Sequence, residues 1–245
     1  MSERKQNKKI DNKAPVIVGV GDFTDRSKED GLNPQELLAK ASQLAIKDSG
    51  IKDLNKQIDY VGVVRFSVDF LTATNQTSFQ YSNFPRTLSN KLGIQATNEV
   101  YAPMGGNSPQ VLLEDALIKI SSGETDCALL AGGEALQTMI ARLKAGMSLD
   151  WLDEPGGNPE MIGNNAIGFS EHEKIHGMDL PTNVYPLFAQ SLRKKDNKTA
   201  EQHLKECSSL FSEFSKVASN NPYSWFPTFR SEEEIAAITK NNRLV

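Results

Sequence analysis

Residues 98–123, NEVYAPMGGNSPQVLLEDALIKISSG, place an apolar strand candidate, a glycine turn and a helix in one continuous stretch. Residues 98–103 are the strand candidate, and residues 104–107 follow as a tight turn. Ser108 is the expected N-cap of an amphipathic helix that runs to Gly123. A strand that ends in a turn and opens a helix is typical of α/β folds.

Three further strands are predicted on either side of this stretch. Valine-rich runs occur at 15–23 (PVIVGVGDF) and 58–66 (IDYVGVVRF), and an apolar run occurs at 126–131 (DCALLA). Short continuous apolar runs of this kind are typical of buried parallel strands.

Helices are predicted between these strands. Asn33 supplies an N-cap, and Glu36 stands three residues later, so a helix is expected from there to about Gly50. A polar loop of Thr, Asn, Gln and Ser leads to a second helix over 84–92, which Gly93 ends. The alternation predicts the class α/β, a βαβαβ unit with a mostly parallel sheet covered by helices.

The pattern divides the chain into three parts. Residues 1–13 are polar and are expected to be a disordered leader, and residues 14–135 form the α/β core. Residues 136–245 are interpreted as a helical insertion or extension, with a Gly/Pro/Asn stretch at 153–165 and a long helical region at 185–218.

Composition excludes several classes of partner. The 245 residues are 38% hydrophobic and 24% charged, with a formal charge of −4, so no basic surface for nucleic acid or anionic membrane is expected. No apolar run approaches the roughly 18 to 20 residues of a membrane span. The two cysteines favour a reducing cytoplasm over a disulfide framework.

The turn at 104–107 is the first candidate for chemistry. Backbone N–H groups and the positive end of a helix dipole meet where a strand turns into a helix. The alternative interpretation is that Gly105 and Gly106 only make a tight connection, since glycine turns before helices are common.

Four stretches resemble one known family. They are PVIVGVGDFTDR (15–26), MGGNSPQ (104–110), DCALLAGGEAL (126–136) and NPYSWFPTFRSEEEIAAITKNNRLV (221–245). Together they look like the thiolase-like acetyl-CoA acetyltransferases of the sterol-carrier-protein-associated branch, over nearly the whole chain from Pro15. The resemblance implies a thiolase-like N-terminal half-fold and acyl transfer from coenzyme A thioesters in lipid metabolism.

The resemblance also implies where the site should be. In active thiolases the strand-to-helix turn carries a nucleophilic cysteine, which a helix N-terminus activates. Here that position falls at about Gly105, which cannot be acylated, so no catalytic residue is assigned. The implied CoA pocket comprises Gly105, Gly106, Asn107, Ser108, Gln110, Gly132, Gly133 and Glu134.

The histidine, the asparagine-containing loop and the second cysteine of thiolases belong to a second half, which would follow Val245. We therefore expect a protein that is catalytically incomplete alone. The alternatives are a non-catalytic CoA-binding or assembly protein and one chain of a split acyltransferase. The expected partners are an acyl-CoA and either a second copy, paired through the strand after Asn98, or a chain that supplies the second half; no other cofactor and no metal are expected.

Other motifs are weighed against this interpretation. His172 and His176 match H-E-x-x-H, a zinc motif on helices, but Gly177 follows at once and no third histidine comes at a suitable spacing. Cys127 lies in an apolar run and is expected to be a buried, inert thiol. Cys207 and His203 share a helix at four-residue spacing and are expected to be structural.

Overall fold

The computed structural model describes residues 14–70, 81–164, 168–240 and 242. The predicted leader 1–13 and most of the polar loop after residue 70 lie outside these residues. The chain forms two compact units, residues 1–165 and 166–245. The first unit contains the sheet.

The sheet of the first unit has four parallel strands. They are β1 (Tyr60–Val64), β2 (Asn98–Ala102), β3 (Ala128–Ala131) and β4 (Glu160–Met161), in the order β3-β1-β2-β4. Each long strand follows the previous one through a helix, as expected of right-handed crossover connections. The predicted α/β class with a parallel sheet is confirmed.

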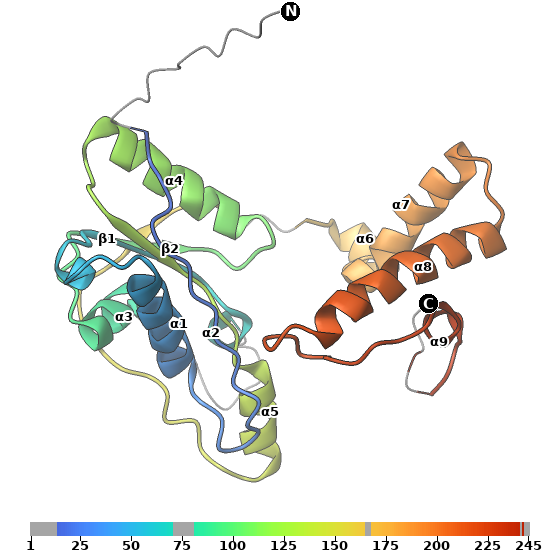
Figure 1. Cartoon of the computed structure of the whole chain (residues 1–245), viewed down its shortest axis with the longest axis horizontal. Coiled ribbons are helices and arrows are strands. Elements are labelled where there is room, and N and C mark those ends of the chain that lie inside the picture. The colour runs from blue at the N-terminus through green and yellow to red at the C-terminus, as the bar shows by residue number, and fades with distance from the viewer. Residues whose placement is uncertain (1–13, 71–80, 165–167, 241, 243–245) are drawn as a thin grey trace, which may run out of the picture. The chain divides into compact units, whose positions relative to one another are not determined.

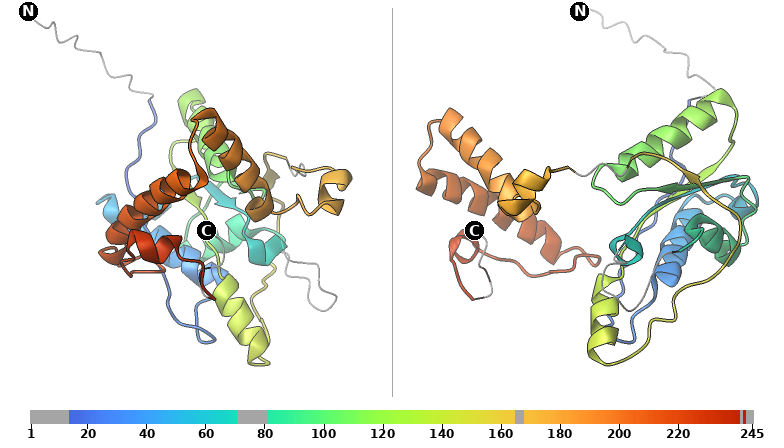
Figure 2. Two further views of the ribbon diagram at one scale, coloured as in Figure 1. Left: turned by 90° about the vertical axis from the view of Figure 1, so that its right-hand side faces the viewer. Right: turned by 180° about the vertical axis from the view of Figure 1, so that it is seen from behind.

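Helices cover both faces of this sheet (Figure 1). The helices α1 (Pro34–Asp48), α3 (Phe84–Leu92) and α5 (Leu136–Lys144) pack over the face that carries Val61, Val63 and Tyr101. The opposite face is covered by α4 (Ser108–Ser122), whose Leu112 and Ala116 contact Tyr60, Val100 and Ala102. The view from behind in Figure 2 shows α4 across the sheet from α1 and α3.

Local signals in the sequence account for the helix ends. Asn33 accepts the Glu36 N–H at 2.9 Å and the Glu36 carboxylate accepts the Asn33 N–H, so the predicted capping box is present. Gly93 and Gly123 end α3 and α4 in the left-handed conformation, which glycine adopts without strain. Two short helices, η1 (Leu54–Lys56) and α2 (Ser67–Phe70), flank β1.

The strand predicted over 15–23 is wrong. These residues belong to no strand of the described part of the chain, and Val16 and Ile17 are 76% and 77% exposed. The segment instead lies along α1, where a side chain at Gly19 or Gly21 would overlap a carbonyl oxygen of that helix. Valine content signals a preference for extended backbone, but a strand also needs a neighbouring strand to accept its hydrogen bonds.

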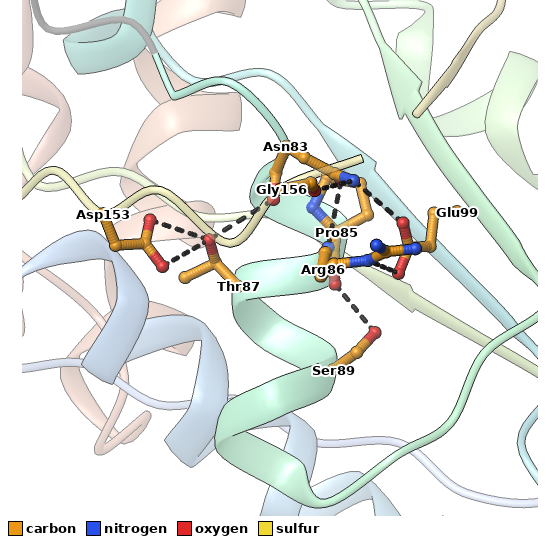
Figure 3. A network of polar contacts seen from close by, with 8 residues as sticks. All are labelled: Asn83, Pro85, Arg86, Thr87, Ser89, Glu99, Asp153 and Gly156. Carbon is orange, nitrogen blue, oxygen red and sulfur yellow. Dashed lines mark hydrogen bonds and ion pairs between the residues drawn. The ribbon is translucent and has the colours of Figure 1, made fainter. Parts of the chain in front are cut away.

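A polar network holds the segment that leads to β4 against α3 and β2 (Figure 3). The Asn83 side chain accepts the Arg86 N–H and donates to Glu99 Oε2 at 2.8 Å and to the Gly156 carbonyl at 3.2 Å. Arg86 Nε lies 2.8 Å from Glu99 Oε1, and the Thr87 hydroxyl donates to the Asp153 carboxylate at 2.8 Å. Asn83 is fully buried, so each of these bonds replaces one that water would otherwise make.

The second unit is helical, with α6 (Glu171–Ile175), α7 (Pro181–Lys195), α8 (Ala200–Ser219) and α9 (Glu232–Ala236). The helical region predicted over 185–218 is divided in two. Asn197 adopts a left-handed φ of 53°, and Thr199 caps α8 through a box with Gln202. Among the described residues, no helix is long and apolar enough to cross a membrane.

We predict that Asn83→Ala destabilises the first unit by about 3 kcal/mol, because the variant loses a helix cap and two tertiary hydrogen bonds. The matched control is Asn33→Ala, which loses a cap on α1 and should cost about 1 kcal/mol. Urea unfolding followed by circular dichroism measures both. Equal losses for the two variants would show that the bonds to Glu99 and Gly156 contribute nothing.

Candidate functional site

The three long strands end at one edge of the sheet, called here the carboxyl edge. The register pairs Val64 of β1 with Ala102 of β2 and Val63 with Ala131 of β3, so the loops after all three strands begin side by side. Ligands of open α/β sheets bind beyond this edge. The carboxyl edge is therefore the candidate site.

The loop after β2 carries the predicted nucleophile turn. Gly105, Gly106 and Asn107 are exposed, whereas Ser108 is buried. The expectation that Ser108 caps α4 is wrong: Asn107 is the cap residue, without a side-chain cap bond, and Ser108 is the first residue of the helix. An asparagine cap at 107 and a serine cap at 108 fit the sequence equally well, which is why the pattern placed the cap one residue late.

A side chain at Gly105 would lie against the side chains of Asn107 and Ser108. A Cβ there would lie 3.1 Å from Ser108 Oγ and 3.2 Å from Asn107 Oδ1, whereas a Cβ at Gly106 would meet nothing within 4 Å. Both contacts are with the ends of side chains, which move by a few tenths of an ångström at little cost. The turn thus accepts a side chain at either position, with different surroundings.

The remaining predicted residues are placed as follows. Gln110 is exposed on α4 and bonds to Glu114 at 3.3 Å. Gly132 and Gly133 follow β3 at the carboxyl edge, and a Cβ at Gly133 would lie 2.6 Å from Leu38 Cδ1, so a side chain there would have to displace the Leu38 side chain of α1. Glu134 accepts the Ser67 N–H at 2.8 Å and joins the loops after β3 and β1.

Sequence reasoning missed three polar residues at the same edge. Arg65 directly follows β1, Asp69 lies in α2 and Tyr101 lies in β2. Asp69 is fully buried and accepts the Tyr101 hydroxyl at 2.7 Å, while Arg65 Nε lies 3.0 Å from the same carboxylate. The only sequence signal was an arginine at the end of a valine-rich strand with an acid four residues later.

The electrostatics of this group follow from its burial. Burial raises the pKa of the Asp69 carboxyl, and the hydrogen bonds from Tyr81 N–H and the Tyr101 hydroxyl, with the charge of Arg65, act in the opposite direction. Burial also raises the pKa of the Tyr101 hydroxyl, so the phenol keeps its proton and acts as a donor.

Cys127 lies away from the carboxyl edge. It directly precedes β3, so it stands at the opposite end of that strand from Gly132. Its side chain packs against the core cluster, and burial raises the pKa of its thiol. The structure places this cysteine where it has no access to the predicted turn.

The other weighed motifs belong to the second unit. His172 is exposed on α6, which has five residues, and exposed His176 caps the end of that helix, with 4.8 Å between the ring centroids. Cys207 Sγ lies 3.7 Å from His203 Nε2 on α8. Among the described residues, no three His, Cys, Asp or Glu side chains gather as metal ligands would.

The chain resembles solved structures of thiolase-like proteins. Neither a protein-family model nor a curated protein matches the sequence. A crystal structure of a monomeric SCP2-thiolase like protein type 1 from Mycobacterium smegmatis superposes with a TM-score of 0.71 at 28% sequence identity. The match covers 96% of this chain and 42% of that one. The fold is thiolase-like.

The predicted resemblance to the sterol-carrier-protein-associated thiolase branch is thereby confirmed at the level of fold. The chain spans less than half the length of the thiolase-like protein that it matches. The positions assigned to the CoA pocket, from Gly105 to Glu134, stay a prediction, as does the absence of a catalytic residue among them.

We predict that Gly105→Cys, in a Cys127→Ala and Cys207→Ala background, gives a thiol whose pKa lies below the ordinary value of about 8.5, because it stands next to the N-terminus of α4. The pH dependence of alkylation by iodoacetamide measures this pKa. Ser121→Cys in the same background is the control, since Ser121 is exposed in the last turn of the same helix, away from its N-terminus. The prediction would be contradicted if the thiol of Gly105→Cys titrated at or above the pKa of the thiol of Ser121→Cys.

Proposed function

We propose that this chain is an acyl-CoA-binding protein of the thiolase superfamily that carries out no thiolysis by itself. The observation that carries the proposal is its likeness to an SCP2-thiolase like protein over 96% of its residues at 28% identity. The exposed turn 104–107 at the end of a parallel strand supports a thioester site there, since turn amides and the helix dipole stabilise negative charge on a carbonyl oxygen.

The missing side chain at Gly105 supports the second part of the proposal. Thiolysis of acetoacetyl-CoA through an acyl-enzyme needs a nucleophile that attacks the 3-keto carbon and breaks the C2–C3 bond, so that acetyl-CoA leaves and the acyl group passes to the thiol of free CoA. Ser108 is the nearest hydroxyl to Gly105, and its residue is 3% exposed. A hydroxyl buried at the first position of a helix is poorly placed to attack a bound ligand.

A second candidate function is one chain of a split acyltransferase. The exposed apolar residues Leu117 and Ile118 on α4 are the observation that favours it. In that case a separate polypeptide would supply the histidine and cysteine that the family resemblance assigns to a second half. A split acyltransferase differs from the acyl-CoA-binding protein proposed first because it needs a partner chain before any turnover occurs.

The outer side of α4 is the surface on which we expect a partner to bind. Leu117 and Ile118 are 37% and 69% exposed there, and the sheet residues Val64, Ala128 and Leu130 on the face that α4 covers are only half-buried. The edge of β2, through which pairing was expected, is already occupied by β4 at Val100 and Tyr101. A second copy or a second-half chain is therefore proposed on the α4 face.

We predict that the purified chain binds butyryl-CoA in isothermal titration and shows no cleavage of acetoacetyl-CoA in the presence of free CoA. The second result is expected because Gly105 offers no nucleophile. Absence of any binding would contradict the first part. Turnover that Ser108→Ala abolishes would contradict the second part and identify a serine nucleophile.

We also predict that the chain self-associates or binds an apolar dye, and that Ile118→Glu reduces both effects because it places a charge on the proposed contact surface. Leu44→Glu is the control, since Leu44 is 39% exposed on α1, over the opposite face of the sheet. Light scattering and dye fluorescence are the measurements. A monomer at high concentration that binds no dye would refute the assignment of this surface.

A further inference from the structure

Asp69 is held by three groups from different elements. Its Oδ1 accepts the Tyr81 N–H at 2.6 Å, and its Oδ2 accepts the Tyr101 hydroxyl at 2.7 Å and lies 3.0 Å from Arg65 Nε. The residue is fully buried, so the carboxylate has exchanged water for these contacts. A buried carboxylate with several donors is fixed in position, because losing any donor would leave charge unsatisfied.

This carboxylate in turn fixes the arginine. Arg65 Nε is buried and faces Asp69, and the guanidinium carbon lies 4.7 Å from the centre of the Tyr101 ring. Ring contact on one side and the carboxylate at Nε leave little rotational freedom to the side chain. Arg65 is thus oriented before any ligand arrives.

The Arg65 side chain is held on one side and partly open to solvent. It pairs with Asp69 through Nε and interacts with the Tyr101 hydroxyl, and 21% of it is exposed. The planar fork of the two Nη groups is the part of arginine that binds carboxylates and phosphates in a bidentate manner.

The position of Arg65 connects it to the candidate site. Its backbone N–H donates to the Ala102 carbonyl at 2.9 Å, so it stands beside the last residue of β2, immediately before the loop that contains Gly105. The loop after β1, which begins with Arg65, and the loop after β2, which contains Gly105, both begin at the carboxyl edge, where α/β sheets bind ligands.

We propose that Arg65, oriented by Asp69 and Tyr101, is an anion-binding residue of this site and takes an oxyanion of the ligand, either a carboxylate on the acyl group or a phosphate of coenzyme A. The inference rests on the proposed acyl-CoA site and names the chemistry that it recognises. Asp69 and Tyr101 act as positioning residues, since they reach the ligand only through Arg65.

The test measures binding of succinate, inorganic phosphate, succinyl-CoA and butyryl-CoA by titration calorimetry. Arg65→Gln removes the charge, and Arg65→Lys keeps the charge but loses the fork. Each should weaken binding of the anion that Arg65 holds by about tenfold or more. Arg142→Gln is the matched control: it removes an arginine of the same unit whose guanidinium donates to the backbone carbonyls of Glu29 and Ser148.

The two sources of the oxyanion give different results. Weaker binding of succinyl-CoA with unchanged butyryl-CoA assigns Arg65 to an acyl carboxylate, whereas equal weakening of both assigns it to a phosphate of coenzyme A. Either result supports the inference. Should Arg65→Gln fail to fold, Arg65→Lys carries the test, with circular dichroism as the check of folding.

Other outcomes separate this inference from the proposed function. CoA thioesters that bind equally to wild type and both Arg65 variants would overturn the inference and leave the proposed function standing. Binding of succinate or phosphate that depends on Arg65, without binding of any CoA thioester, would support the inference and overturn the proposed function. Failure of the wild type to bind any probe would overturn both.

Discussion

Parallel alignment of β1, β2 and β3 is the constraint on which the rest of the first unit depends. Parallel strands must return through crossovers, so the connecting helices α3 and α4 lie on the faces of the sheet and the loops that follow β1, β2 and β3 begin at one edge. The register of Val64 with Ala102 fixes the arginine after β1 beside the glycine turn after β2. A shift of one residue would turn Arg65 toward α4 and away from Tyr101.

The two faces of the sheet are covered unequally. Three helices and a large aromatic cluster cover one face, where Phe66, Tyr81 and Phe84 meet edge to face within 5.8 Å. One helix covers the other face, and the cluster beneath it is small. The polar group lies on the same side as the larger cluster: Arg65, Asp69 and Tyr101 all belong to the well-covered face. Rigid packing around them is what allows charged groups to keep a fixed geometry.

Local signals in the sequence predicted most of this architecture. Capping residues such as Asn33 and terminating glycines such as Gly93 act within four residues, so the ends of α1 and α3 could be placed almost to the residue. The strand predicted at 15–23 failed because pairing depends on residues distant in the chain. The Asp69–Tyr101 bond joins residues 32 positions apart, and no periodicity reports such a contact. At the candidate site, the turn could be located by sequence, but the arginine beside it could not.

The network around Asn83 joins contacts of very different range. Asn83 and Arg86 reach Glu99 over 16 and 13 positions, whereas Asn83 reaches Gly156 over 73 and Thr87 reaches Asp153 over 66. Closing the longer loops costs more chain entropy. We therefore expect α3 and β2 to associate before the segment that leads to β4 docks against them. In native-state hydrogen exchange, β4 and residues 151–157 would then open at a lower free energy than α3. They would open together, as one cooperative unit at the edge of an otherwise stable sheet.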